Sequence, residues 1–219
     1  MDLDVIIRNF EFIIGGLALT FQLALLTVVG GLFMGIVLAM ARLSSRPWIY
    51  YPATLYIHFF RGLPLILVIF WLYFLFPVVI GRPMGAFSSA IISFIVFEAA
   101  YFAEIMRAGM QSVARGQALA AYSSGLTSYQ TTYYVLLPQA FRNMVPSLIN
   151  QTVIIFQDTS LAYVIGLREF LRRVNLVDAR EVRSIELYLF AALVYFIICS
   201  TGSLISHRLE KKRVGRLFN

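Results

Sequence analysis

The chain has 219 residues, of which 60% are hydrophobic and 13% are charged, and it carries a net charge of +7. Soluble domains carry roughly a quarter charged residues, so this composition argues against a water-soluble globular protein. The 16 Arg and two Lys flank apolar runs, which is the arrangement expected at the ends of membrane spans and argues against a nucleic-acid-binding protein.

Several uncharged runs reach the length of about 20 residues that a helix needs to cross a bilayer. The alternating pattern of a membrane barrel is absent, so we expect an all-α integral membrane protein with five transmembrane helices. It should form a single domain over residues 1–219, with its core at about 15–207, its N-terminus outside and its C-terminus in the cytoplasm. The predicted spans are approximately 15–41, 63–81, 86–107, 143–166 and 187–206.

The first span contains Gly31 and Gly35, a pair of small residues that allows another helix to approach closely, although glycine is common in membrane helices anyway. Residues 47–60 form a short neutral run with Pro52 inside it, which we interpret as an interfacial or tilted segment leading into the second span.

The single Cys199 lies in an apolar run, so no disulfide framework is possible. No basic region precedes the first apolar run, so we expect no cleaved signal peptide.

Residues 117–141 are uncharged but rich in Gln, Ser, Thr and Tyr. We interpret them as a cytoplasmic helix–turn–helix, with Gly125 as the break, Ser128 as the N-cap of the next helix and Pro138 interrupting the return to the membrane. If they crossed the bilayer, the chain would have six spans and their polar side chains would need partners in hydrocarbon. With five spans and an outside N-terminus, 11 of the 18 basic residues lie inside. The hydrophilic loop 168–186 weakens this charge argument, because its arginines would lie outside.

A neutral helix of small residues on the cytoplasmic face suits docking into a groove of another protein, and the alternative is a loop packed on its own bundle. The segment also carries a spaced signature: Leu119-Ala120-Ala121, three residues, Gly125, nine residues, Val135, one residue and Leu137-Pro138. This spacing resembles the EAA signature of the permeases of ATP-binding-cassette (ABC) importers. In that signature the position of Leu119 is Glu.

The surrounding segments resemble the polar amino acid subfamily of these permeases, and the similarity runs from about Gly15 to the last span. They include YIHFFRGLPLILVIFWLYF from Tyr56, FEAAYFAEIMRAGMQSV from Phe97 and the run from Arg115 that contains LPQAFR. The phrase Phe156-Gln157-Asp158-Thr159-Ser160 resembles the glutamate/aspartate branch, whose members often pair as two different permeases.

The resemblance implies a type I, MetI-like importer domain in a bacterial cytoplasmic (inner) membrane. Its implied partners are two ATP-binding subunits, a second permease chain, either a related mate or another copy, and a periplasmic or surface substrate-binding protein. The chain lacks a Gly-x4-Gly-Lys-Ser/Thr loop, so we expect no cofactor and no ATPase activity of its own, with ATP and Mg held by the partner.

The resemblance also implies an ATPase-coupling loop at about 116–141. Its candidate coupling residues are Gly116, Gln117, Leu119, Ala120, Ala121, Gly125, Leu126, Leu137 and Pro138. Because Leu119 replaces the acidic residue of the signature, one polar contact with the ATPase would be lost.

Ionisable groups within spans are functional candidates. Glu98, with Tyr101 one turn further along, either lines the substrate path or is paired inside the bundle, for example with Arg61. Glu104 and Arg107 are expected to form a local pair. The residues that we assign to a substrate path are Arg61, Gly62, Pro64, Glu98, Tyr101, Gln157, Asp158, Thr159 and Ser160.

Two of these groups have an alternative role. The polar patch around Asp158 serves either as path or gate, or as a source of hydrogen bonds between helices. The segment Arg61–Pro64 is either a helix break with a fixed cation, suited to a carboxylate, or a hinge with an Arg that reaches to the interface. His58 and His207 have no metal-ligand neighbours in the sequence, so we expect no metal site.

The sequence therefore predicts a permease subunit that imports polar amino acids, best glutamate or aspartate, powered by a partner ATPase. The alternative is a secondary transporter driven by an ion gradient, which would need internal repeats that the sequence does not show. No catalytic or metal-binding constellation supports a membrane enzyme.

Overall fold

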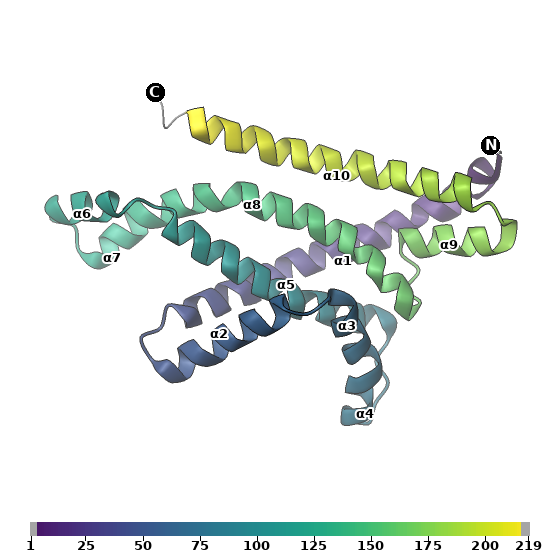
Figure 1. Ribbon diagram of the computed structural model, residues 1–219, viewed down its shortest axis with the longest axis horizontal. Coiled ribbons are helices and arrows are strands. Elements are labelled where there is room, and N and C mark those ends of the chain that lie inside the picture. Colours follow the sequence, from purple (N-terminus) through teal and green to yellow (C-terminus); the bar gives the residue numbers. More distant parts are fainter. Residues whose placement is uncertain (1–3, 216–219) are drawn as a thin grey trace.

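The computed structural model describes residues 4–215, with side chains up to Glu210, and this range contains helices and no strands (Figure 1). Residues 1–3 at the N-terminus, and the side chains of the basic tail residues Lys211, Lys212, Arg213 and Arg216, lie outside the described part. The helices are α1 (Asp4–Arg42), α2 (Pro47–Arg61), α3 (Leu65–Phe70), η1 (Trp71–Leu75), α4 (Phe76–Ile80), α5 (Ala86–Gln111), α6 (Arg115–Ser123), α7 (Ser128–Gln130), η2 (Thr131–Leu136), α8 (Leu137–Asp158), η3 (Thr159–Ile165), α9 (Phe170–Glu181) and α10 (Ser184–Gly215).

Three described helices, α1, α5 and α10, are long and apolar enough to cross a membrane. A fourth span results if α2 and the continuous helix of α3, η1 and α4 form one broken span, since they meet at a bend of 106°. The polar residues of α8 keep it outside this group, so the five-span topology stays a prediction. At 39 residues, α1 is about 58 Å long and starts well before the predicted residue 15, because its polar first turns extend beyond a hydrocarbon core of about 30 Å.

The most extensive helix contact in the described part runs between α1 and α5, where glycines remove the side chains that would keep the backbones apart. A Cβ atom on Gly35 would lie 2.6 Å from the Cβ of Phe102 and 3.1 Å from the backbone N of Ala103. A Cβ on Gly31 would meet Phe102 at 3.2 Å and Glu98 at 3.3 Å. The small-residue pair of the first span is therefore a packing feature, and it brings Glu98 up against α1.

The segment predicted as a hydrophilic loop, 168–186, is instead the amphipathic helix α9, so that prediction was wrong. Phe170, Val174 and Val177 recur at helical spacing and are fully buried in a cluster with residues of α1 and α10. The carboxylate of Glu169 caps the helix by accepting hydrogen bonds from the backbone N–H groups of Leu171 (2.8 Å) and Arg172 (2.6 Å). The arginines of this segment therefore project from a packed helix.

The return from α6 to α8 also differs from the prediction. Thr127, one residue before the predicted Ser128, is the N-cap, and it forms a capping box with Gln130. Pro138 does not interrupt the helix. The preceding turn η2 is a π-helix, in which the Leu137 N–H bonds to the carbonyl of Thr132, five residues back, and this wider turn accommodates the proline ring.

Candidate substrate path and coupling surface

The predicted helix–turn–helix is present at one end of the molecule, where α6 and α7 lie beyond the ends of the long helices (Figure 1). Gly125 forms its break with a φ of +83°, in the left-handed region that only glycine adopts without strain. The Gly125 N–H donates to the carbonyl of Tyr122 at 3.0 Å, and the Leu126 N–H donates to that of Ala121 at 3.2 Å. The chain thereby reverses direction over four residues after α6.

The surface of α6 is uncharged apart from Arg115 and is largely open. Leu119 is 66% exposed, Tyr122 is 47% exposed, and Ala121 alone in the helix is buried. One polar contact ties α6 to α8, because Gln139 Nε2 donates to Gln117 Oε1 at 3.2 Å. Of the candidate coupling residues, the exposed ones are Gly116, Gln117, Leu119, Ala120, Gly125, Leu137 and Pro138, while Leu126 is half-buried. Apart from the Gln117 contact, the exposed members of this set leave an uncharged and largely apolar surface on α6 and the start of α8.

Glu98 lies in the interior between α1, α5 and α8 and is 1% exposed. Gln151 Nε2 donates a hydrogen bond of 2.7 Å to its Oε2, and no described residue donates to its Oε1. The suggested pairing of Glu98 with Arg61 is wrong, because the Arg61 guanidinium lies 3.8 Å from Glu104 instead. A carboxylate this deeply buried, with one oxygen that accepts no hydrogen bond in the described part, is costly, so Glu98 stays a candidate for contact with a ligand.

Tyr101 connects Glu98 with two other path candidates. The Arg61 guanidinium lies over the Tyr101 ring, 5.6 Å from its centroid. The Tyr101 side chain is within electrostatic reach of Glu98, Arg61 and Asp158, and Glu98 is in turn within reach of Asp158. Arg61 of α2, Glu98 of α5 and Asp158 at the end of α8 are thus all within electrostatic reach of one phenol.

The other path candidates make contacts of their own. Thr159 is buried and its hydroxyl donates to the Phe156 carbonyl at 2.7 Å, so it serves the local helix turn. Gln157 bonds to Cys199 of α10, and Ser160 is half-buried. Gly62 and Pro64 contribute backbone only, since they form the break between α2 and α3 beside Arg61.

Two polar side chains, Gln151 and Arg42, contact the predicted residues Glu98 and Glu104 but were not predicted from the sequence. Gln151 donates a hydrogen bond of 2.7 Å to Glu98, but as the middle one of three consecutive polar residues, Asn150, Gln151 and Thr152, it carries no sequence signal that singles it out. Arg42 closes the first span and donates to Glu104 at 2.7 Å. The predicted local pair of Glu104 with Arg107 is confirmed, but it belongs to a cluster in which Arg42, Arg61 and Arg107 share one carboxylate.

Two cavities adjoin these helices. A polar cavity of about 560 Å³ is lined by Gln151 and extends to His207 and Glu210 near the end of α10. It therefore reaches from the partner of Glu98 to the C-terminal part of α10.

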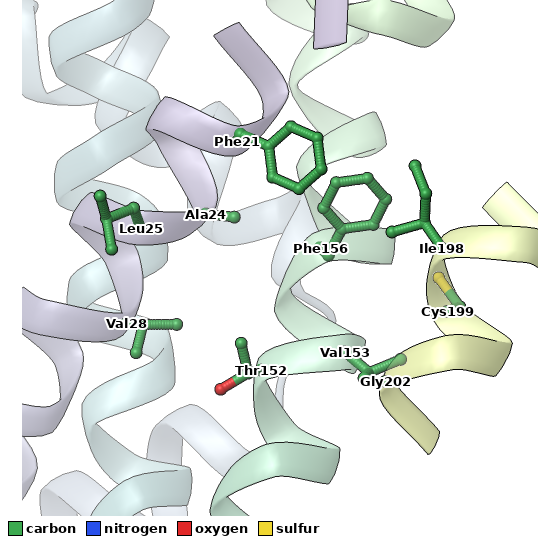
Figure 2. A pocket seen from close by; sticks show the side chains of 10 residues that line it. All are labelled: Phe21, Ala24, Leu25, Val28, Thr152, Val153, Phe156, Ile198, Cys199 and Gly202. Carbon is green, nitrogen blue, oxygen red and sulfur yellow. The ribbon is translucent and has the colours of Figure 1, made fainter. Parts of the chain in front are cut away.

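The second cavity, of about 290 Å³, lies between α1, α8 and α10, and the rings of Phe21 and Phe156 pack against each other at its wall (Figure 2). The hydroxyl of Thr152, on its wall, already donates to the Leu148 carbonyl at 2.9 Å. No charged side chain lines this apolar cavity, so it lacks the groups that a zwitterionic amino acid needs.

Comparison with known proteins decides the family. Residues 28–215 match the family described as "Binding-protein-dependent transport system inner membrane component". The chain belongs to this family. It is a membrane permease subunit of an ABC amino acid importer, a class of subunit that works with ATPase subunits and a second permease and has its ATPase activity in those partners.

Individual relatives cover nearly the whole chain. The glutamate/aspartate import permease protein GltK of Escherichia coli O157:H7 is 38% identical over 218 residues, covering 96% of this chain and 97% of its own. The L-cystine transport system permease protein TcyB of Bacillus subtilis (strain 168) is 36% identical, covering 95% of this chain and 90% of its own. A solved amino acid ABC transporter, crystallised with histidines, superposes with a TM-score of 0.91 at 31% identity and covers 97% of this chain and 99% of its own. The fold is thus that of a type I, MetI-like importer.

Proposed function

We propose that this permease carries glutamate or aspartate across a bacterial cytoplasmic membrane. The observation that carries the proposal is that Arg61 lies over the Tyr101 ring and that Glu98 and Asp158 are within electrostatic reach of the same side chain. An acidic amino acid has two carboxylates and one ammonium. Arg61, beside the α2–α3 break, supplies a cation for a carboxylate, and Glu98 and Asp158 supply acceptors for the ammonium. The identity with GltK and the Phe156–Ser160 phrase point to the same substrates.

A second candidate substrate is a basic amino acid, such as arginine or histidine. The specific observation in its favour is that two carboxylates, Glu98 and Asp158, but only one guanidinium, that of Arg61, are within electrostatic reach of Tyr101, so the group as a whole is acidic. The solved relative that contains histidines is consistent with such a ligand in the family.

The test is transport by the reconstituted complex: this chain, a second permease chain, two ATPase subunits and the substrate-binding protein in lipid vesicles. Uptake of labelled glutamate should depend on internal ATP, and unlabelled aspartate should compete with it while arginine and histidine do not. Competition by arginine or histidine alone would overturn the acidic-substrate proposal in favour of the second candidate. Uptake driven by an ion gradient without the ATPases would support a secondary transporter, which the family assignment argues against.

The proposal includes a mechanical role for α6 as a coupling helix. Its uncharged, exposed face would sit in a cleft of an ATPase subunit, which binds ATP and Mg, and closure of that subunit would move α6 and rock the helices joined to it. A periplasmic or surface binding protein would deliver the substrate at the opposite end. Leu119, 66% exposed in place of an acidic residue, would contribute apolar contact to this interface.

A further inference from the structure

Positive charge is in large excess around Glu104. Residues 12–97 and 105–157 contain no Asp or Glu, yet they supply Arg42, Arg61 and Arg107 to this single carboxylate. The Arg42 side chain is only 16% exposed and Arg107 is 31% exposed, so water compensates their charge incompletely. One carboxylate among three guanidiniums leaves a surplus of two positive charges at a partly buried place.

A cavity of about 310 Å³ opens beside these arginines, between the ends of α1 and α5 and the start of α2. Its polar lining comes from Arg42, Tyr50, Arg107 and Gln111. Its apolar lining includes Leu43, Met106 and Met110. The cavity therefore offers cations to one portion of a ligand and an apolar surface to another.

The surrounding side chains are typical of the boundary between membrane and water. Trp48 is 69% exposed and Tyr51 is 67% exposed, and the Arg46 guanidinium lies 5.7 Å from the Trp48 ring. Aromatic rings of this kind favour the headgroup level of a bilayer. The cavity thus lies where a phospholipid has its phosphate, at the end of the bundle that carries α6 (Figure 1).

We propose that this cavity is a binding site for an acidic phospholipid. The lipid phosphate accepts charge-assisted hydrogen bonds from Arg42 and Arg107, while an acyl chain lies along Leu43, Met106 and Met110. A free anion such as inorganic phosphate shares the headgroup chemistry but has no apolar part to contact Leu43, Met106 and Met110. A lipid accounts for both the basic and the apolar lining of the cavity. The site is separate from Glu98 and does not depend on which amino acid is transported.

The test uses the purified permease–ATPase complex, taken from vesicles of phosphatidylglycerol and phosphatidylethanolamine into native mass spectrometry, which counts the lipids retained on the intact complex. The wild-type complex should retain phosphatidylglycerol selectively. Arg42→Gln should lower the retained phosphatidylglycerol about fivefold, the value expected for one basic residue near an acidic membrane. Its control, Arg142→Gln, removes an exposed charge outside the cavity and should leave retention unchanged.

A second variant leaves every charge in place. Met110→Trp fills the cavity and should lower retention as strongly as Arg42→Gln, while Ala108→Trp, exposed on the same helix, should not. Met110→Trp tests the lipid-site proposal even if the Arg42→Gln complex fails to assemble. Unchanged retention in Met110→Trp, or an equal loss in Arg142→Gln, would overturn the proposal. Displacement of the lipid by millimolar inorganic phosphate alone would assign the site to a free anion and overturn it as well.

Discussion

At the scale of single residues, Glu98 has the least favourable environment for a charged group in the described bundle. It is almost completely buried, has one hydrogen bond from a neutral amide, and has no cation in contact. Burying such a group costs several kcal/mol unless it is neutralised or paired, so a fold selected for stability alone would place an apolar side chain here. The cost is understandable if the substrate supplies the missing partner during transport.

This account predicts the outcome of Glu98→Gln. The amide keeps the shape and can still bond with Gln151, so the complex should assemble with an unchanged or higher melting temperature. Uptake should fall about ten- to a hundredfold, mainly through a higher KM, because a charge-assisted bond to the substrate ammonium is lost. The measurement is the concentration dependence of uptake in vesicles.

A matched control separates this effect from the general loss of a buried carboxylate. Glu169 is equally buried, but its oxygens cap α9, so Glu169→Gln should lower the melting temperature and leave the KM of the assembled complex unchanged. If Glu98→Gln transports with wild-type kinetics, Glu98 belongs to the structure of the bundle rather than to the path.

At the scale of secondary-structure elements, close packing of α1 on α5 positions Glu98, and Gly35 is the residue that permits it. The atoms that a new Cβ would meet at Gly35 are backbone and Cβ atoms of α5, which cannot rotate away. At Gly30 the nearest atom is Ile95 Cδ1, the end of a flexible side chain. The two glycines lie on one helix and differ only in what faces them.

Gly35→Ala should therefore destabilise the protein by about 1–3 kcal/mol, the usual cost of overpacking, and Gly30→Ala should cost much less because Ile95 can change rotamer. The check is thermal unfolding of both variants in the same detergent. Equal melting temperatures for the two would show that α1 and α5 are free to move apart and that the close contact is not required.

The turn after α6 gives a second element-scale prediction. Gly125 has a φ of +83° and open space around its Cβ direction, so Gly125→Val strains the turn by about 1–2 kcal/mol without disturbing the bundle. If α6 transmits force, this variant should insert normally but lose ATP-dependent uptake while ATP hydrolysis continues or the ATPase dissociates. Uptake and hydrolysis are measured on the same vesicles.

Gly81→Val is the control for this experiment, because Gly81 also has a positive φ, +74°, and open space around it, but it lies in the α4–α5 connection. It applies the same backbone strain far from α6. Normal transport by Gly125→Val, or the same defect in both variants, would contradict the coupling role.

The elements also show what the sequence could and could not predict. Long apolar runs identified α1, α5 and α10, and the Gly125 break and the α6 helix followed from turn chemistry. The helix α9 was missed because its many arginines suggested a loop, although Phe170, Val174 and Val177 follow a helical period. Contacts between distant segments, such as Gln151 with Glu98, depend on helix packing and have no signal in local sequence.

At the scale of the whole molecule, the two ends differ in how their basic residues are compensated. At the end that carries α6, Glu104 is shared by three arginines. At the opposite end, acids accompany the basic residues: Arg8 lies 3.8 Å from Glu181, and Asp178 and Glu169 occupy the same helical region. Since acids have little influence on orientation, the arginines around α9 weaken the charge argument for topology, and the orientation needs a direct measurement.

The orientation can be measured by labelling introduced cysteines, since Cys199 is the single native cysteine and is buried. Val182, 81% exposed in the α9–α10 turn, and Ser123, exposed at the end of α6, lie at opposite ends of the molecule (Figure 1). With an outside N-terminus and five spans, a membrane-impermeant maleimide should label Val182→Cys in intact cells and should label Ser123→Cys only after permeabilisation. Labelling of both from outside would mean that an even number of crossings separates them, so that α8 alone does not carry the chain across the membrane, and the reverse pattern would place α6 where no ATPase could reach it.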